Sequence, residues 1–344
     1  MSSYDLVRVD DEGGSSSQNA IIAAIADQVA ARHALSDYQK RLSANTRRRQ
    51  TDDLALFARY LGLAGIQTTG LQLMADIMTW QGITHGLISG FIRYQEQEGY
   101  AIGSINVRLA TVKRYCSIAA ESHVIDAAAA GLIARVKGYS HKDGRNLDKD
   151  RAIARKGVKK AEPVIIPKDQ ATQLKQGQPD TPQGRRDALL MCLLLDHGLR
   201  CGEIAQLLLS CVNLNEETLT FYREKVDMEQ THELTKDTRV ALRRYLESVK
   251  LGPGDSLLAG SRRGGQLLGR MSERAITARM NELGQRLGIN GLSAHDGRHA
   301  WATFAIKAGT DVKALQDAGG WKSPVMPLRY AASGKIANAG VKLE

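Results

Sequence analysis

Apolar residues recur at helical spacing through most of this chain, and that periodicity limits the possible folds more than any other feature. Within residues 43–65, for example, Leu54, Phe57 and Leu61 fall on one face of a helix. Only residues 216–235, "EETLTFYREKVDMEQTHELT", alternate as a strand, a turn and a second strand would. The sequence therefore predicts a mostly α chain that contains a small antiparallel sheet.

A basic stretch of low apolar periodicity separates two helical regions. Between Lys137 and Lys160 there are nine Lys and Arg residues against three Asp residues. Such a run is either a solvated linker or a strap across phosphate groups, and the basic balance of the chain favours the strap. We expect a flexible N-terminus over residues 1–17, a helical domain over 18–137, the basic linker over 138–162, and a second domain, with helices and the small sheet, over 163–344.

The net charge of +10 over 344 residues favours a polyanionic partner, with nucleic acid first and an anionic membrane surface second. Aromatic residues make up 5% of the sequence, too few for stacking many single-stranded bases, so duplex DNA fits better. No apolar run approaches the roughly 20 residues of a membrane span, and the acidic N-terminus differs from a secretory signal. We expect a cytoplasmic protein that associates with the nucleoid.

Arg200 lies between two predicted helices, just after a glycine that would end the first of them. A guanidinium at a helix start is unfavourable for the helix dipole unless an anion is nearby. Glu203, one turn further on, can hold the Arg200 side chain in place, although a surface ion pair is the plainer interpretation. Arg200 alone is therefore only a weak indication of an anion site.

Further polar residues cluster near the end of the chain. His295 and Arg298 are three residues apart at the head of a predicted helix, so both side chains can face one point. Trp321 precedes Tyr330 by nine residues, and two prolines fix the backbone between them. Taken singly, a capping histidine, an exposed arginine, a core tryptophan and a half-buried tyrosine are all ordinary residues.

The chemistry that these residue types share is an attack on a phosphodiester that needs neither metal nor ATP. The sequence has no acidic cluster for two magnesium ions, no GxxxxGK[ST] phosphate loop, and four cysteines without metal-binding spacing. It does have arginines to neutralise the non-bridging oxygens and a tyrosine oxygen to form a covalent intermediate. A lysine in the predicted hairpin can protonate the leaving oxygen.

The ordered set of these residues resembles the tyrosine recombinases, the phage integrase family. The set comprises Arg200-x-x-Glu203, a hairpin lysine, His295-x-x-Arg298, Trp321, and Tyr330 close to the end of the chain. The tryptophan and its "AGGW" context look most like the Cre type of this family. The resemblance is specific over the second domain, whereas over the first domain only the helical pattern supports it.

The resemblance implies a role for each matching residue. Tyr330 would be the nucleophile that forms a 3′-phosphotyrosyl bond, and Arg200 and Arg298 would clamp the scissile phosphate. His295 would assist proton transfer to and from the tyrosine or the phosphate. Rejoining would need no ATP, because the phosphotyrosyl bond conserves the bond energy, and no cofactor is expected.

Three further residues complete the implied catalytic set. Trp321 would donate its indole N–H to a phosphate oxygen, and Glu203 would orient neighbouring cationic groups. Lys225 would be the general acid for the 5′-oxygen, with Lys236 as the fallback. His299 would be structural rather than catalytic.

The resemblance also implies a C-shaped clamp around duplex DNA, made of an N-terminal core-binding domain and an α+β catalytic domain. The expected N-terminal DNA contacts are Arg47, Arg48, Arg49, Arg108, Lys113 and Arg114. The tail, with Ile336, Ala339 and Val341, is either a frayed terminus or a segment that docks on a neighbouring protomer. Docking would build a homotetramer on synapsed inverted-repeat sites from chains that are monomeric or weakly associated when free.

The expected function is that of a site-specific recombinase that cleaves and rejoins duplex DNA through a 3′-phosphotyrosine. A type IB topoisomerase, which shares this chemistry but relaxes DNA with little site choice, is the alternative. A non-catalytic DNA-binding protein on the same fold is a third interpretation. Retention of all the matching side-chain types argues against that third interpretation.

Overall fold

The computed structural model describes residues 16–149, 163–262 and 265–332, and the statements below concern those residues. The chain divides into two compact units, Met1–Lys159 and Lys160–Glu344, and each unit has its own hydrophobic core. Among the described helices, none is both long enough and apolar enough to cross a membrane. The predicted flexible N-terminus lies almost entirely outside the described residues.

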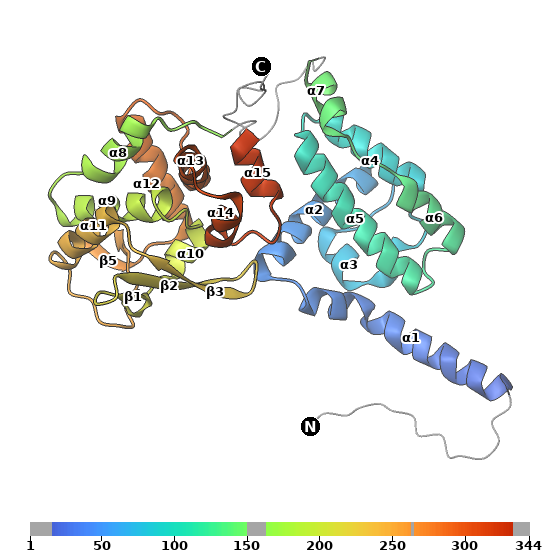
Figure 1. Cartoon of the computed structure of the whole chain (residues 1–344). Helices are drawn as coiled ribbons and strands as arrows, with labels where there is room; N and C mark the ends of the chain where they lie inside the picture. The colour runs from blue at the N-terminus through green and yellow to red at the C-terminus, as the bar shows by residue number, and fades with distance from the viewer. Residues whose placement is uncertain (1–15, 150–162, 263–264, 333–344) are drawn as a thin grey trace, which may run out of the picture. The chain divides into compact units, whose positions relative to one another are not determined.

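Helices build the N-terminal unit (Figure 1). They are α1 (Ser16–Lys40), α2 (Ala44–Leu63), α3 (Gly70–Ala75), the 3-10 helix η1 (Ile77–Trp80), α4 (His85–Gln97), α5 (Ile102–Glu121), α6 (Ala127–Arg135) and α7 (His141–Lys149). Polar caps fix where several of them begin: the Ser43 hydroxyl, for example, accepts a hydrogen bond from the backbone N–H of Thr46 at the start of α2. Helix α7 lies within the predicted basic linker, whose remaining residues 150–162 are outside the described part of the chain.

Aromatic side chains fill the centre of the N-terminal core. Trp80 is fully buried and stacks on Phe57, with ring centroids 5.9 Å apart, and on Tyr115, at 5.6 Å. Phe91 meets the edge of Phe57 at 5.0 Å. Such pairs add to the free energy gained by burying the rings, so they fix how α2, α4, α5 and η1 pack within this unit.

The C-terminal unit combines helices with two small antiparallel sheets, and the comparisons with known structures below support the predicted fold class. Its helices are α8 (Lys168–Gln176), α9 (Pro182–Leu195), α10 (Cys201–Gln206), η2 (Leu209–Cys211), α11 (Lys236–Leu246), α12 (Glu273–Arg286), α13 (Ala294–Lys307), α14 (Val312–Gly319) and α15 (Val325–Ala332). The first sheet has the order β1 (Val212–Asn213), β2 (Thr218–Arg223), β3 (Met228–Glu233). The second sheet pairs β4 (Ala259–Ser261) with β5 (Leu267–Arg270), a hairpin that the sequence pattern does not predict.

Helix α9 forms the centre of the C-terminal unit and packs against α8, α11 and α13 (Figure 1). Every residue from Leu189 to Leu195 is buried, so this helix is apolar on all sides over its second half. Thr181 caps its start by accepting a hydrogen bond from the backbone N–H of Gly184. Because α9 is enclosed by other helices, its C-terminal end is a rigid base for the loop that follows.

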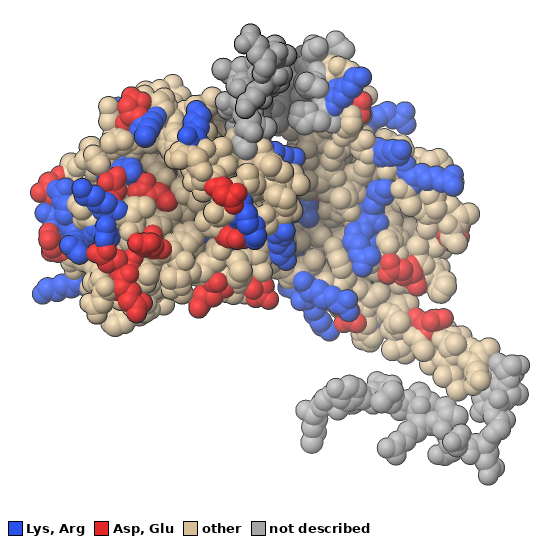
Figure 2. Space-filling model, viewed as in Figure 1, with Lys and Arg blue, Asp and Glu red and all other residues tan. Residues whose placement is uncertain are grey.

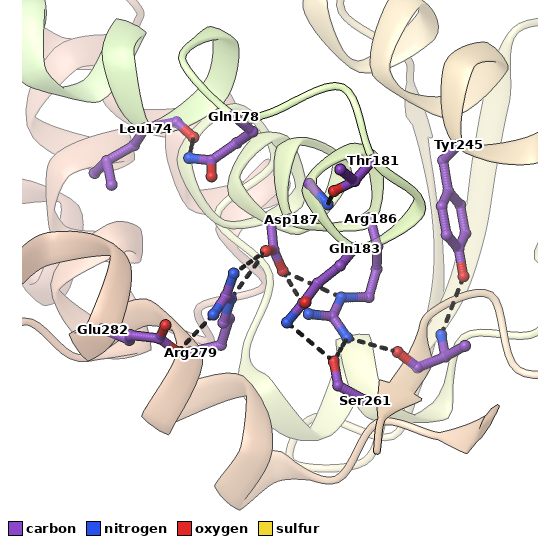
Figure 3. A network of polar contacts seen from close by, with 12 residues as sticks. Leu174, Gln178, Thr181, Gln183, Arg186, Asp187, Tyr245, Ser261, Arg279 and Glu282 are labelled. Carbon is purple, nitrogen blue, oxygen red and sulfur yellow. Dashed lines mark hydrogen bonds and ion pairs between the residues drawn. The ribbon is translucent and has the colours of Figure 1, made fainter. Parts of the chain in front are cut away.

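A buried ionic network fastens α9 to α12 and to the second sheet (Figure 3). One carboxylate oxygen of Asp187 accepts hydrogen bonds from Arg186, at 2.6 and 3.1 Å. The other accepts two from Arg279 of α12, at 2.9 and 2.5 Å. Arg186 also donates to the carbonyl of Ala259 and the hydroxyl of Ser261. Asp187 therefore balances two guanidinium groups in a place that water does not reach.

We predict that Asp187→Ala costs about 3–5 kcal/mol of folding free energy, because it leaves the buried Arg186 without its carboxylate partner. The control is Glu282→Ala, which removes an exposed partner of Arg279 and should cost at most about 1 kcal/mol. Urea unfolding of both variants measures the difference. Equal midpoints for the two variants would contradict this account of the network.

Candidate active site

A sharp break between α9 and α10 presents Arg200 at the start of the second helix. Gly198 makes the turn with φ +60°, and a Cβ there would lie 2.3 Å from the ring of Trp301, so only glycine fits. The Glu203 carboxylate accepts hydrogen bonds from the backbone N–H of Arg200, at 2.8 Å, and from its guanidinium, at 2.6 Å. Glu203 is 7% exposed, so this contact differs from an ordinary surface ion pair.

A further arginine, Arg223 at the end of β2, also binds Glu203. One of its terminal nitrogens lies 3.0 Å from each carboxylate oxygen, and the residue is fully buried. The other terminal nitrogen donates to the carbonyl of Ala318 at 2.8 Å. Arg223 is not among the residues predicted from the sequence, although it lies in register with Leu219 and Phe221 on the buried face of the strand. A charged residue at a buried register position was the signal that could have found it.

Arg298 joins the ends of two helices that are far apart in the sequence. Its guanidinium donates to the carbonyl of Gly198, after α9, at 2.6 Å, and to the carbonyl of Gly319, the last residue of α14. It also lies over the ring of Trp321, 4.4 Å from its centroid. Arg298 is only 3% exposed, and its contacts with the two carbonyls and the indole hold its guanidinium in one orientation.

The site carries more positive than negative charge. Burial, followed by the nearby Arg200 and Arg223, lowers the pKa of Arg298 to about 9, so its guanidinium is still protonated at neutral pH. Glu203 opposes this shift, but a single carboxylate serves all three guanidinium groups. An anion placed among them would relieve the repulsion, which is the behaviour expected of a phosphate site.

Tyr330 is carried into the same site by the short helix α15. The residue is 5% exposed, and its ring meets the edge of His299 at 5.0 Å and lies 5.8 Å from Trp321. Burial raises the pKa of the Tyr330 phenol, although the charges of Arg298 and Arg200 act in the opposite direction. The phenol is therefore protonated at neutral pH, and its use as a nucleophile requires a base.

Two histidines on consecutive turns of α13 lie beside the tyrosine. The rings of His295 and His299 are 4.7 Å apart, edge to face, and His299 is the one that contacts Tyr330. Burial, Arg298, Arg200 and Lys225 lower the pKa of His295, and burial and His295 lower that of His299. Both imidazoles are therefore neutral at neutral pH and can accept a proton.

Lys225 lies in the turn between β2 and β3 and is exposed. It is close enough to His295 to lower that histidine's pKa, so the hairpin brings it to the edge of the site. The fallback residue, Lys236, begins α11 and instead lines a separate cavity of about 250 Å³ together with Lys175 and Arg185. Of the two lysines, Lys225 is therefore the one whose charge acts on His295.

The six basic residues expected to contact DNA lie on α2 and α5 of the N-terminal unit, and several already have partners. Arg49 and Arg108 pair with the buried Asp53, at 2.7 and 3.8 Å. Lys113 donates to the carbonyls of Ala134 and Val136 at the end of α6, where a helix dipole favours a cation.

Arg114 forms an exposed ion pair with Glu121. Arg47 and Arg48 are exposed near the start of α2, where Arg47 donates to the carbonyl of Gln39. Lys and Arg side chains are spread over the visible face of this unit, with few acidic side chains between them (Figure 2). This face of the unit is therefore basic, although some of the expected contacts also hold the unit together.

Within the C-terminal unit, the structure brings together the site residues that the sequence predicts for the second domain, from Arg200 to Tyr330. The predicted tail residues Ile336, Ala339 and Val341 lie outside the described residues. In the described part of the chain, no group of three or more His, Cys, Asp or Glu side chains has a geometry suited to a metal ion.

The amino-acid sequence of this chain is similar to those of known proteins. The phage integrase family model matches residues 165–335. The chain is 26% identical over 247 residues to tyrosine recombinase XerC of Haemophilus ducreyi, covering 71% of this chain and 73% of that protein. It is 24% identical over 246 residues to tyrosine recombinase XerA of Thermococcus kodakarensis, covering 67% and 85% of the respective chains.

Solved structures share the fold at lower sequence identity. The Tn1549 transposon integrase in complex with transposon right end DNA is similar with a TM-score of 0.58 and 13% identity, over 89% of this chain and 96% of that one. A lambda integrase dimer bound to a COC′ core site is similar with a TM-score of 0.51 and 15% identity, over 95% and 91%. These similarities support the predicted class of helices with small antiparallel sheets.

Proposed function

This chain belongs to the phage integrase family of tyrosine recombinases, and on that premise we propose that Tyr330 cleaves and rejoins duplex DNA through a 3′-phosphotyrosine. The observation that carries the proposal is the convergence of Tyr330 with the two arginines: the Trp321 ring contacts both Arg298 and Tyr330, and Arg298 donates to the carbonyl of Gly198 in the loop that presents Arg200. The relatives are named as tyrosine recombinases, which supports site-specific recombination over the topoisomerase-like alternative. The more specific likeness to the Cre type stays a prediction.

In the first chemical step, the Tyr330 oxygen attacks the phosphorus and the bond to the 5′-oxygen breaks. The phenol proton passes to the neutral His295 by way of His299, whose ring contacts both groups, so His299 would have a relay role beyond the structural one that the resemblance implies. Lys225 gives a proton to the departing oxygen. Arg200 and Arg298 neutralise the non-bridging oxygens as charge develops on them. The products are a phosphotyrosyl ester and a free 5′-hydroxyl, so protons and bonds balance without metal or ATP.

Rejoining reverses these roles. A 5′-hydroxyl attacks the phosphotyrosine, Lys225 takes its proton, and His295 returns a proton to the phenolate of Tyr330. The bond energy is conserved in the ester, so exchange between two DNA molecules needs no external energy source. Trp321 would donate its indole N–H to the same phosphate, and its contact with Arg298 supports this role because it holds the ring beside that guanidinium.

DNA binding and assembly complete the proposal. The basic N-terminal unit would contact phosphates, mainly through Arg47 and Arg48, as part of a clamp around the duplex. Four chains would act on two synapsed sites, each an inverted repeat, with the C-terminal tail as the connecting segment. Light scattering on the synapsed complex would count the chains, and two rather than four would contradict the tetramer. Association with the nucleoid follows from DNA binding and is part of the same proposal.

We predict that Tyr330→Phe binds DNA with near-normal affinity but forms no covalent adduct, because only the nucleophilic oxygen is lost. Gel electrophoresis under denaturing conditions detects the adduct, and a filter-binding titration measures the affinity. A variant that still forms the adduct would show that another residue, such as Tyr222 or Tyr245, is the nucleophile. Loss of DNA binding would instead mean that the phenol mainly serves the fold.

We predict that Lys225→Ala slows cleavage by about 100-fold or more, since the 5′-oxygen then leaves without a proton donor. A DNA whose bridging 5′-oxygen is replaced by sulfur should cleave at a rate close to that of the unaltered protein, because a thiolate leaves without protonation. Lys236→Ala is the matched control and should behave normally on both DNAs. A loss that sulfur does not restore rules out Lys225 as the acid.

The fall of the cleavage rate at acid pH should report the protonation of His295. Because its pKa is lowered from 6.5, the imidazole stays neutral as pH falls to about 6.5 and becomes protonated only below it. Cleavage measured at subsaturating DNA, which reports the free enzyme, should therefore fall only below that pH. Rates measured from about pH 5 to about pH 8 test this, and an acid limb at or above the ordinary histidine pKa contradicts it.

A further inference from the structure

Arg223 has no counterpart among the residues assigned above, yet it is bound on three sides. Its guanidinium donates to both oxygens of Glu203 on α10, to the carbonyl of Ala318 on α14, and to the side chain of Gln230 on β3. Arg223 itself belongs to β2. A single buried side chain thus connects the helix that carries Arg200, the hairpin, and the last turn of α14.

The connection between the hairpin and α14 is reinforced by neighbouring groups. The side-chain amide of Gln230 donates to the carbonyl of Asp317 at 2.5 Å. A ring nitrogen of His232 lies 3.2 Å from the carbonyl of Ala318. The last carbonyls of a helix have no partner within that helix and carry partial negative charge, so a cation such as Arg223 is favoured there.

The backbone after α14 is shaped to admit this side chain. Gly320 has φ +58°, and a Cβ at that position would lie 2.6 Å from the Cδ atom of Arg223. Both the conformation and the space therefore require glycine. Burial lowers the pKa of Arg223, and the charge of Glu203 acts against this shift, so the guanidinium is stabilised only while these contacts hold.

Arg223 is also the residue on which the hairpin turn closes. Its backbone carbonyl accepts hydrogen bonds from the N–H groups of Val226, at 3.1 Å, and Asp227, at 2.9 Å. Lys225 lies inside this turn. The side chain of Arg223 is anchored to the core of the site, and its backbone holds the loop that carries the lysine.

We propose that Arg223 is a positioning residue that places Lys225 against the leaving 5′-oxygen. This inference rests on the proposed function, in which Lys225 is the general acid. It predicts that loosening Arg223 impairs protonation of the leaving group while DNA binding persists. A residue needed only for stability would impair cleavage of every substrate alike.

The test compares cleavage of ordinary DNA with cleavage of DNA that carries a bridging 5′-sulfur. Arg223→Lys keeps the charge but cannot reach all three partners, and we expect it to cleave ordinary DNA about 100-fold more slowly. The sulfur substrate should restore most of that loss. Affinity for DNA should change less than threefold, roughly the range of a lost surface contact.

Two further variants keep the test decisive. Gln230→Ala removes a partner of Arg223 from a less buried position, so it can test the inference if Arg223→Lys does not fold. We expect it to lose less of the cleavage rate on ordinary DNA, and the sulfur substrate should again restore that rate. Arg239→Lys is the matched control, because Arg239 binds Glu217 at the other end of the hairpin. It should cleave both substrates normally.

The outcomes separate this inference from the proposed function. If sulfur restores Lys225→Ala but restores neither Arg223→Lys nor Gln230→Ala, then Arg223 does not act through Lys225, and the acid assignment stands. Normal cleavage by both variants also overturns the inference. If sulfur does not restore even Lys225→Ala, the assignment of the acid is wrong, and the role of Arg223 is wrong with it.

Discussion

The geometry of the site depends on the contacts that the Glu203 carboxylate makes with two arginines. This carboxylate is buried between Arg200 and Arg223, and it also accepts the backbone N–H of Arg200, so it fixes a helix start and two guanidinium groups together. A buried ion pair is rarely a strong source of stability, because desolvation offsets much of the attraction. Here the ion pairs of Glu203 fix the orientation of the two arginine side chains rather than adding much stability.

The same charges set the protonation states that the chemistry requires. Burial keeps the phenol of Tyr330 protonated, and burial together with the arginines keeps His295 neutral. The phenol proposed as the nucleophile therefore still holds its proton, and it lies beside neutral imidazoles that can accept one. Phosphate binding would add negative charge near both groups and partly offset the field of the arginines. In the proposed mechanism, Tyr330 would thus be a protonated phenol before DNA binds and would lose its proton only during the attack on the phosphate.

The sequence predicts most helices because their apolar spacing and their caps are local properties. Arg200, Arg298 and Tyr330 could be found because residue type, order and spacing carry the chemistry. The strand register places Arg223 at a buried position, but its role could not be predicted, because its partners Glu203 and Ala318 lie 20 and 95 residues away. Likewise, Lys113 looks like a DNA contact in the sequence, and only the fold brings it to the end of α6. Local patterns do not specify which distant carbonyl or carboxylate a basic side chain will meet.

The use of carbonyls as partners explains how the site can bury arginines and still attract phosphate. Arg298 donates to the carbonyls of Gly198 and Gly319, which satisfy its N–H groups without cancelling its charge. A carboxylate in either place would hold the guanidinium as well but would compete with the phosphate for it. Carbonyls free to accept such bonds occur where helices end. This requirement accounts for the two carbonyls that Arg298 uses: Gly198 lies in the break that follows α9, and Gly319 is the last residue of α14.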